Sequence, residues 1–490
     1  MNLNEKEFLD IYDSGKSFFL YKVIPADLFT PVFILNKISK ISPYHLLFES
    51  VTGGEKRGRY SILASLPDKI WKYENGKVTI GAGNNSFKEI NEKPFDSLRK
   101  FQADSKIDLD SGLPQMAAGI FGFMGYDMVR LMETLPDKNP SNIDIPDSIF
   151  FRPQLVVIFD NILDKMFIIS PVYASKKESG KSKFRQAKKI IDDFISNISK
   201  KEKIKFNEPL DQKIELTSHV EKQEYFNMVS RAKEYIKAGD IFQIVPSRRF
   251  SAKFKLPPIS FYRALRSLNP SPYLFYVNLA GFTLIGSSPE ILVKLKDGKV
   301  TIRPIAGTRK RGTSEESDLL LEKELMADQK EIAEHLMLLD LGRNDVGRVA
   351  VEGTVKVTEK MFIERYSHVM HIVSNVEGDI KPGKDFLDSL IAGFPAGTVS
   401  GAPKIRAMQI IEELESERRQ FYAGAVGYIS HTGNMDVCIA LRTALIKDGK
   451  IYMQAGGGVV YDSTEEGEFN ETQNKVAALI KAAEIAQNYV

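Results

Sequence analysis

Short apolar runs separated by short turns recur along the second half of the chain, and this spacing constrains the fold more than any other feature. The runs have the length and composition of strands, and lie at residues 242–245, 273–277, 282–285, 291–295, 300–304, 425–429 and 437–446. Asp448-Gly449, directly after the last run, is typical of a hairpin turn. Because strands joined by short turns pair with their sequence neighbours, this pattern favours antiparallel sheets with helices packed outside. The predicted fold class is α+β.

Helical spacing and a polar stretch indicate how the rest of the chain is organised. Apolar residues between Tyr225 and Ile236 predict a helix that ends at Gly239, and residues 316–341 predict one long helix. In the first half, the runs 155–159 and 166–170 predict a hairpin. The polar stretch 200–222 contains Pro209 and is typical of a linker. We therefore expect two regions, 1–211 and 212–490, with a boundary at Asp211.

The composition excludes several classes of protein. Hydrophobic residues make up 43% of the 490 residues and charged residues 27%, which is ordinary globular usage. No run approaches the roughly 18 consecutive apolar residues of a membrane helix, and the first residues lack the apolar core of a signal peptide. Cys438 is the only cysteine, which excludes an internal disulfide and a Cys-rich zinc site. We expect a cytoplasmic protein with no membrane partner.

The charge pattern does not predict a nucleic-acid partner. The net charge is only +3, and the local basic excess lies between Ser175 and Phe206. In that segment Phe184, Ile191 and Phe194 recur at helical spacing, so the lysines are typical of the solvated side of an amphipathic helix. Neither a phosphate-binding Walker loop nor a dinucleotide fingerprint is present, so a reaction driven by ATP or NAD is unsupported.

Two pairs of glutamates recur with the same helical spacing. Glu331 and Glu334 lie three residues apart, as do Glu468 and Glu471, so each pair shares one face of a helix. For any one pair taken alone, a solvated helix face is the favoured interpretation. Two observations favour a buried site instead: the first pair adjoins apolar residues expected to be buried, and a glycine run precedes the second pair. These apolar residues are Ile332, Leu336, Met337 and Leu338, and the glycines are Gly456, Gly457 and Gly458.

If the two pairs converge, they require a cation. Two carboxylates about 5 Å apart repel each other by roughly 3 kcal/mol at an effective dielectric constant near 20. An all-oxygen ligand set selects Mg²⁺ or Mn²⁺ over zinc. Arg442, among apolar neighbours, and Lys475, one turn after Glu471, could bind a carboxylated substrate in the same half. Taken alone, each of the two is more typical of a surface charge, Arg442 less so because its neighbours are apolar.

Nine segments of the second half, in this order, resemble the chorismate-binding enzymes, and most closely the large subunits of anthranilate synthase. They are GDIFQIVPSRRF (239–250), NPSPYLF (269–275), SSPE (287–290), PIAGTR (304–309), EHLMLLDLGRNDVGRV (334–349), YSHVMH (366–371), GTVSGAPKIR (397–406), QAGGG (454–458) and ETQNK (471–475). The first half carries weaker matches, LFES (47–50) and GFMGYDMVR (122–130).

The resemblance implies a fold and a set of site residues. The implied fold is two large antiparallel β-sheets packed as a sandwich with flanking helices. Glu334 and Glu471 would bind Mg²⁺ directly, Glu331 and Glu468 would contact it through water, and the ion would hold the ring carboxylate of chorismate. Thr398 would line the same site. The positions that match substrate contacts are Gly307, Thr308, Tyr422, Arg442, Gly456, Gly457, Gly458 and Lys475.

Two positions separate the reactions of this family. Isochorismate-forming relatives carry a lysine at the position of Gln243, where it activates water. Glutamine cannot take up a proton near neutral pH, but it can orient ammonia by hydrogen bonding. Aminodeoxychorismate synthases carry a nucleophilic lysine at the position of Ala306, and a methyl group cannot attack. The resemblance thus favours direct amination to anthranilate. The alternatives are an aminodeoxychorismate synthase, a hydroxylating enzyme and a non-catalytic scaffold.

By the same resemblance, Glu290 is the general acid that protonates the departing hydroxyl, and His371 assists the elimination of pyruvate. On spacing alone, Glu290 could form a salt bridge at a strand end, and His371 could be a core histidine bonded to the backbone. The resemblance favours the catalytic interpretation of both residues.

The sequence also implies a partner and an effector. Cys438, in an apolar run, cannot serve as the nucleophile of a glutaminase, so ammonia would come from a glutamine amidotransferase subunit, component II of anthranilate synthases. The resemblance implies a heterotetramer of two large and two small subunits. Five further residues resemble the pocket that binds the feedback inhibitor tryptophan in this family. The alternative is that they only pack the two regions against each other. These residues are Glu49, Ser50, Pro272, Tyr273 and Leu274.

Overall fold

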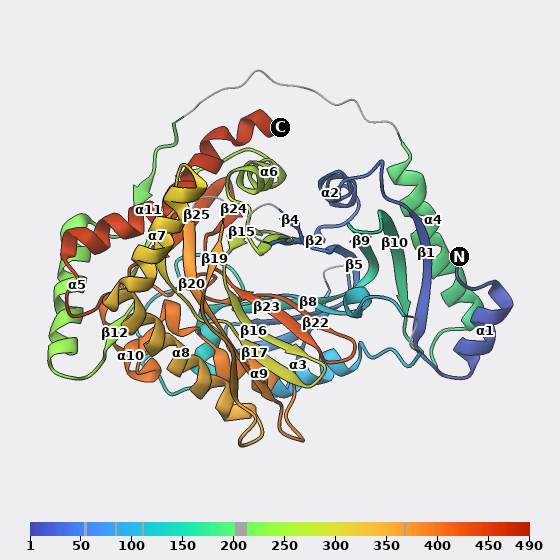
Figure 1. Cartoon of the computed structure of the whole chain (residues 1–490). Coiled ribbons are helices and arrows are strands. Elements are labelled where there is room, and N and C mark those ends of the chain that lie inside the picture. Colours follow the sequence, from blue (N-terminus) through green and yellow to red (C-terminus); the bar gives the residue numbers. More distant parts are fainter. Residues whose placement is uncertain (53–55, 84–85, 110–111, 201–212, 367–368) are drawn as a thin grey trace.

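Figure 1 shows the computed structural model, which describes residues 1–52, 56–83, 86–109, 112–200, 213–366 and 369–490. The boundary expected at Asp211 lies outside the described residues. The α-helices are α1 (Glu5–Asp13), α2 (Pro31–Ser39), α3 (Pro94–Ala103), α4 (Gly180–Ile198), α5 (Lys222–Lys237), α6 (Pro258–Leu268), α7 (Glu315–Ala327), α8 (Gln329–Val349), α9 (Phe386–Gly393), α10 (Lys404–Leu414) and α11 (Glu465–Ile485). Short 3₁₀ turns add η1 (Gln115–Ala117), η2 (Tyr126–Leu131), η3 (Gly397–Val399) and η4 (Ala486–Tyr489).

The strands run through both halves of the chain. Those of the first half are β1 (Phe18–Pro25), β2 (Tyr44–Glu49), β3 (Val51–Thr52), β4 (Lys56–Arg57), β5 (Tyr60–Glu74), β6 (Lys77–Gly81), β7 (Phe87–Ile90), β8 (Gly119–Met124), β9 (Ser148–Asp160) and β10 (Lys165–Val172). Those of the second half are β11 (Thr217–Ser218), β12 (Gln243–Ile244), β13 (Ser247–Lys253), β14 (Tyr273–Leu279), β15 (Thr283–Ser288), β16 (Ile291–Lys296), β17 (Lys299–Ile302), β18 (Ile305–Lys310), β19 (Lys356–Arg365), β20 (Val369–Asp379), β21 (Gly401–Ala402), β22 (Ala425–Ser430), β23 (Met435–Ile439), β24 (Thr443–Lys447) and β25 (Lys450–Gly456).

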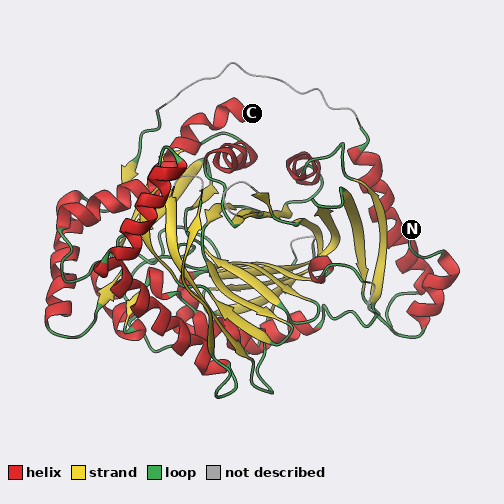
Figure 2. Ribbon diagram, in the orientation of Figure 1, coloured by secondary structure: helices red, strands yellow, loops and turns green. Residues whose placement is uncertain are grey.

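The predicted α+β class is confirmed. In the described part of the chain, 21 strands join one hydrogen-bonded network that curls so that its layers face each other, with helices outside (Figure 2). The two halves share this network, because β2 pairs with both β5 and β14 and because β8 pairs with β22, all antiparallel. The predicted hairpins are also confirmed. β9 pairs with β10, and Asp448 and Gly449 connect β24 to β25 with φ of 48° and 71°.

Two clusters of buried apolar side chains stabilise the layers. One cluster joins strands β5, β8, β9, β16 and β22 to helices α3, α8 and α9, and Trp71, Phe121 and Phe150 are among its members. The other lies under α1, α2, α4, α6 and α11. As predicted from the lysine-rich segment, α4 turns Phe184, Ile191, Phe194 and Ile198 into this second cluster, with its charged side chains outside. Among the described residues, every helix falls short of the length or the apolarity that crossing a bilayer requires.

The single long helix expected over residues 316–341 is wrong, because two helices meet there. The α7 helix ends at Ala327 and α8 begins at Gln329. Asp328 separates them in an extended conformation and accepts hydrogen bonds from the backbone N–H groups of Lys330 and Glu331. This side-chain cap satisfies donors at the start of α8 that a continuous helix would have bonded internally.

The strand expected over residues 437–446 is likewise interrupted. The β23 strand ends at Ile439 and β24 begins at Thr443, and Arg442 at the break has φ of 46°. The Arg442 carbonyl accepts a hydrogen bond of 3.1 Å from Ser287 N–H. The break changes the direction of the Arg442 side chain from the alternation that one straight strand would impose. The expected strand 242–245 is only two residues long, and Phe242 beside it is 69% exposed.

Candidate active site

Ends of strands and starts of helices bring together the residues expected to act on a substrate. Glu290 lies between β15 and β16, and His371 lies on β20. Thr398 lies in η3, and Arg442 at the break between β23 and β24. The acidic pairs lie on α8 and α11, and the glycine run follows β25. Sequence positions more than 200 residues apart thus contribute to one cluster of polar side chains.

Glu290 is a buried carboxyl whose side chain has one hydrogen-bonding side chain among the described residues. The Thr398 hydroxyl donates to Glu290 Oε1 at 3.0 Å. Burial raises the pKa of Glu290 to about 8, although the Thr398 bond and the charges of Lys475 and Arg442 oppose the rise. At neutral pH the group is therefore mostly protonated and can donate a proton, as a general acid must. The salt bridge considered from the sequence is not formed between described residues.

His371 is a buried, neutral imidazole with one ring nitrogen held in place. Its Nδ1 lies 3.1 Å from the Gly307 carbonyl and 3.0 Å from the Thr308 hydroxyl. Burial, reinforced by the charge of Arg442, lowers the pKa of His371 to about 4. Because a carbonyl only accepts, Nδ1 carries the proton of the neutral ring. The Nε2 lone pair, which has no hydrogen-bond partner among the described residues, can then take up a proton.

Gln243 contacts one of the acidic pairs and carries an acceptor oxygen left unpaired by the described residues. Its Nε2 donates to Glu334 Oε1 at 3.0 Å, and the side chain is 3% exposed. Its Oε1 is buried and has no hydrogen-bond partner among the described residues. The amide orientation follows from the chemistry, because an ionised carboxylate can only accept. Gln243 therefore presents an unsatisfied acceptor, a group that a small N–H donor could satisfy.

The two acidic pairs are electrostatic neighbours, and each carboxylate has its own partner. Arg309 bonds Glu331 at 3.0 Å, Gln243 bonds Glu334 at 3.0 Å, Ser463 bonds Glu468 at 2.7 Å and Lys475 bonds Glu471 at 2.7 Å. Burial raises the pKa of Glu468 to about 7, with Glu471 and Glu334 raising it further against the Ser463 bond. Burial also raises the pKa of Glu334, with contributions from Glu331 and Glu471.

This donor set fits a divalent cation such as Mg²⁺. The four side chains offer only oxygen atoms, and buried Glu468 Oε2 has no partner among the described residues. Burial raises the pKa values of Glu334 and Glu468, and repulsion from neighbouring glutamates adds to the rise. A cation would relieve this repulsion. As the side chains stand, no three acidic, histidine or cysteine groups of the described residues form a metal-ligating arrangement. To bind an ion, the four glutamates would have to exchange their present hydrogen-bond and ion-pair partners for it.

The apolar neighbours of the first pair are only partly buried. Leu338 is 5% exposed, as expected, but Leu336 is 43% exposed, so the expectation that it is buried was wrong. Ile332 and Met337 are intermediate. Since α8 turns one side to solvent, a residue two positions from Glu334 points away from the site.

The two basic residues differ in their partners. Lys475 Nζ donates a hydrogen bond to the Gly456 carbonyl at 2.9 Å. Burial alone would lower the pKa of Lys475, but the charge of Glu471 and the hydrogen bond to it outweigh burial and raise the pKa. Burial lowers the pKa of Arg442, and its guanidinium has no hydrogen-bonded or ion-pair partner among the described residues. A half-buried guanidinium without a carboxylate partner suits an anionic ligand.

Four glycines and a tyrosine shape the same cluster. Gly307 has φ of 76° in a β-bulge of β18, and a Cβ there would lie 3.3 Å from Glu331 Oε2. A Cβ on Gly457 would lie 2.5 Å from Glu468 Oε2, and one on Gly458 3.0 Å from Gln243 Nε2. The buried Tyr422 hydroxyl would lie 3.1 Å from a Cβ on Gly456. Backbone and carboxylates thus approach closely where larger residues would displace them.

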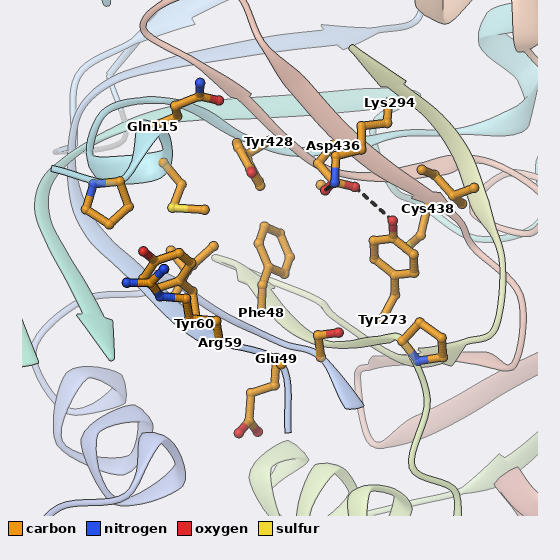
Figure 3. A pocket seen from close by; sticks show the side chains of 18 of the residues that line it. Phe48, Glu49, Arg59, Tyr60, Gln115, Tyr273, Lys294, Tyr428, Asp436 and Cys438 are labelled. Carbon is orange, nitrogen blue, oxygen red and sulfur yellow. Dashed lines mark hydrogen bonds and ion pairs between the residues drawn. The ribbon is translucent and has the colours of Figure 1, made fainter. Parts of the chain in front are cut away.

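Apart from this cluster, a cavity of about 910 Å³ lies next to the strands β2, β14 and β16. All five residues expected to form an effector site line it. In Figure 3, Phe48 and Tyr273 point into the cavity, and the Tyr273 hydroxyl bonds Asp436 at 2.9 Å. The Glu49 side chain points away from it, because Tyr262 and Arg266 of α6 bond its carboxylate at 2.6 to 2.9 Å.

Several residues of both sites had no role in the sequence interpretation. Arg309 and Ser463 bond the acidic pairs, and Tyr366 packs edge-on against His371 with ring centroids 5.4 Å apart. The remaining cavity walls include Arg59, Tyr60, Lys294, Tyr428 and Asp436. Tyr366 is the first residue of the resembling motif that contains His371, and this could have indicated that it belongs to the site. For Arg59 and Asp436 nothing in the local sequence indicates a site, because the cavity forms from strands distant in sequence.

Comparisons with known proteins agree with this geometry. A family model described as "chorismate binding enzyme" matches residues 45–481. Anthranilate synthase component 1 of Cereibacter sphaeroides is 49% identical over 97% of this chain and 96% of its own length. The Aquifex aeolicus protein of the same name is 45% identical over 99% of both chains.

Solved structures extend the likeness to the fold. Anthranilate synthase component I from Streptococcus pneumoniae is 38% identical, with a TM-score of 0.76 over 86% of this chain and 92% of that one. The isochorismate synthase MenF from Escherichia coli has a TM-score of 0.71 at 19% identity over 96% of this chain and 95% of that one, which shows a shared fold alone. On the family match and the near full-length relatives, the chain belongs to the chorismate-binding enzymes, and within them to the anthranilate synthase component 1 proteins.

Proposed function

We propose that this chain combines chorismate with ammonia and releases anthranilate, pyruvate and water. The near full-length likeness to proteins named anthranilate synthase component 1 supports this reaction. The observation that carries it is the buried Gln243 side chain, whose amide group bonds Glu334 and whose oxygen has no partner among the described residues. That oxygen can accept a hydrogen bond from ammonia and orient it, but it cannot deprotonate water.

The first half of the reaction is amination. Ammonia forms a bond to ring carbon C2 and releases one proton to solvent, the ring double bonds shift, and the C4 hydroxyl leaves as water after taking a proton from Glu290. Glu290 suits this role because burial raises its pKa to about 8. Arg442 and Lys475 would hold the carboxylates of the substrate, each as a cation able to donate to an anion.

The second half is elimination. His371 Nε2 takes the proton from C2, the bond between C3 and the enolpyruvyl oxygen breaks, and the ring becomes aromatic. The released enolpyruvate takes up a proton and becomes pyruvate. His371 suits this role because burial keeps it neutral, with the proton on Nδ1. Ala306 on β18 offers no nucleophile, so the aminodeoxychorismate alternative is not favoured.

A magnesium ion is part of this proposal. Glu334 and Glu471 would bind it directly, and Glu331 and Glu468 through water. When bound, it would neutralise the ring carboxylate of the substrate and the crowded glutamates. The all-oxygen donors and the unpartnered Glu468 Oε2 support this assignment.

The ammonia would come from a second protein. Relatives named component 1 imply a component 2, and we propose a glutamine amidotransferase in that role within a cytoplasmic heterotetramer of two large and two small subunits. Cys438 supports this division of labour, because it is buried and burial raises its pKa. A thiol in that state cannot attack glutamine.

Replacing Gln243 by lysine tests the positioning of ammonia. An ammonium group at this position would pair with Glu334 and remove the acceptor oxygen. We expect the ammonia-dependent rate constant kcat/KM to fall by about 10- to 100-fold. Initial rates of anthranilate fluorescence with ammonium as the nitrogen source would measure this change.

The matched control is Gln223→Lys, since Gln223 is exposed on α5. Ammonia-dependent activity in Gln243→Lys equal to that of the control would remove Gln243 from the reaction.

We propose tryptophan as an inhibitor that occupies the 910 Å³ cavity. Aromatic walls of Phe48, Tyr60 and Tyr428 suit an indole ring, and Asp436 suits an ammonium group. The volume is within the range of small-molecule pockets.

A Ser50→Phe variant tests this location. The added ring would fill part of the cavity, so we expect the inhibition constant for tryptophan to rise by about 10-fold or more. Anthranilate formation without tryptophan should be retained, because Ser50 lines the 910 Å³ cavity and is not among the residues proposed to act on chorismate. Dose–response curves of the two proteins measure the change, with Ser182→Phe on the exposed side of α4 as control. Unchanged inhibition in Ser50→Phe would move the effector site elsewhere.

A further inference from the structure

The side chain of Arg303 lies in the wall of the 910 Å³ cavity and also pairs with a residue next to the catalytic cluster. Arg303 follows β17, and its Nη2 lies 3.4 Å from Glu364 Oε2 on β19. The side chains of Arg303 and Glu364 are 30% and 24% exposed. Arg303 also lies over the Phe362 ring, 5.8 Å from its centroid. Arg303 therefore belongs to the cavity wall and contacts a carboxylate that is not among the residues lining the cavity.

Glu364 in turn holds Tyr366 against His371. The Tyr366 hydroxyl donates to Glu364 Oε2 at 2.8 Å, and the Tyr366 ring meets the His371 ring edge-on at 66° with centroids 5.4 Å apart. In the antiparallel pairing of β19 with β20, Glu364 lies directly opposite His371. Opposed residues share one face of a sheet, so the three side chains form one layer.

Tyr366 is itself anchored and buried. It is 6% exposed, its backbone N–H bonds the Val369 carbonyl at 2.8 Å, and Arg311 bonds its carbonyl at 2.7 Å. With the main chain fixed, the hydroxyl bond to Glu364 is what sets the direction of the ring. The direction of the ring in turn limits how the His371 imidazole can turn about its bonds to Gly307 and Thr308.

We infer that Arg303, Glu364 and Tyr366 position His371 and convey to it whether the 910 Å³ cavity is occupied. The inference rests on the proposed function and concerns its regulation. A bound ligand with a carboxylate competes with Glu364 for Arg303. Glu364 then loses its cation, the hold on Tyr366 loosens, and Nε2 of His371 leaves the direction that elimination needs. Arg303 would thus have two states, one paired with Glu364 and one paired with the ligand. Coupling between two sites requires an element with two such states.

Tyr366→Phe and Glu364→Gln test the positioning. Phe keeps the ring but loses the bond to Glu364, and Gln keeps the size but loses the charge. We expect kcat for anthranilate to fall about 10-fold while KM for chorismate changes little. An aminated product that retains its enolpyruvyl group should accumulate, as detected by mass spectrometry, because elimination slows and amination does not. The matched control is Glu359→Gln, exposed on the same strand.

Arg303→Gln tests the coupling. The variant removes the cation that pairs with Glu364, so we expect kcat without tryptophan to fall toward that of Tyr366→Phe, and saturating tryptophan to lower it further by several-fold less than in the wild type. The affinity for tryptophan, measured by calorimetry, should also fall, because the ligand carboxylate loses the guanidinium. Wild-type kcat together with full inhibition at saturating tryptophan would overturn the coupling.

A readout independent of turnover keeps the inference separate from the proposed function. Nitrogen-15 NMR of the imidazoles, with His371 assigned by His371→Gln, should show shifted His371 signals in Tyr366→Phe and in Glu364→Gln but not in Glu359→Gln. An inactive wild-type chain would contradict the proposed function alone. An active wild-type chain whose Tyr366 and Glu364 variants match Glu359→Gln in product and in NMR signals would overturn the relay.

Discussion

Glu290→Gln is expected to lower the rate of anthranilate formation by about 10²- to 10⁴-fold, the usual contribution of a general acid. Glutamine keeps the shape of the side chain and its bond to Thr398, but it has no proton to give to the departing hydroxyl. Rates with ammonium at pH 7 and saturating chorismate measure the effect. A variant within two-fold of the wild type would show that another group protonates the leaving oxygen.

The pH dependence of the same step follows from the raised pKa of Glu290. The acid form is needed and is present below about pH 8, so kcat should fall as pH rises through about 8. Free ammonia must be held constant across the series, because its fraction also changes with pH. Since the Thr398 bond opposes the rise of this pKa, Thr398→Val should move the alkaline limb to higher pH. An alkaline limb unchanged by Thr398→Val would assign it to a different group.

Glu471→Ala is expected to abolish turnover that depends on magnesium, with a loss of about 100-fold or more in metal affinity. The variant removes a carboxylate proposed to bind the ion directly and leaves Lys475 without its partner at 2.7 Å, so a cation would gain a positive neighbour in place of a carboxylate. Titration of activity with Mg²⁺ and of bound Mn²⁺ by electron paramagnetic resonance measure the loss.

The control for this change is Glu466→Ala, an exposed glutamate on the same helix that pairs with Lys222. A metal response in Glu471→Ala equal to that of Glu466→Ala would remove Glu471 from the ligand set.

Much of the fold was predictable because its signals are local. Asp448-Gly449 specified a hairpin, and the spacing of Phe184, Ile191 and Phe194 specified α4. The break between α7 and α8 was missed because apolar spacing continues across it. Asp328, followed three residues later by Glu331, has the pattern of a helix start and could have revealed the break.

The break before β24 had no such signal. Arg442 is not a residue type that favours positive φ, and its conformation is fixed by contacts with the neighbouring strand, such as Ser287 N–H. Tertiary contacts of this kind override local preference, and they decide where the Arg442 side chain points.

The candidate site was predictable as a set of residues and not as a set of contacts. The glutamate spacing and the resembling motifs indicated which side chains come together in the cluster. The bond from Arg309 to Glu331 and the packing of Tyr366 on His371 depend on how β18, β19 and β20 pair, which is a long-range property. The walls of the 910 Å³ cavity come from strands far apart in sequence, so its volume could not be predicted from the sequence.

Product analysis of the purified chain tests the central claim most directly. The chain is incubated with chorismate, Mg²⁺ and ammonium at mildly alkaline pH, and the products are followed by fluorescence and mass spectrometry. The account predicts anthranilate and pyruvate in equal amounts, lost when EDTA is added. A hydroxylated product, or an aminated product that keeps its enolpyruvyl group as the final species, would contradict it.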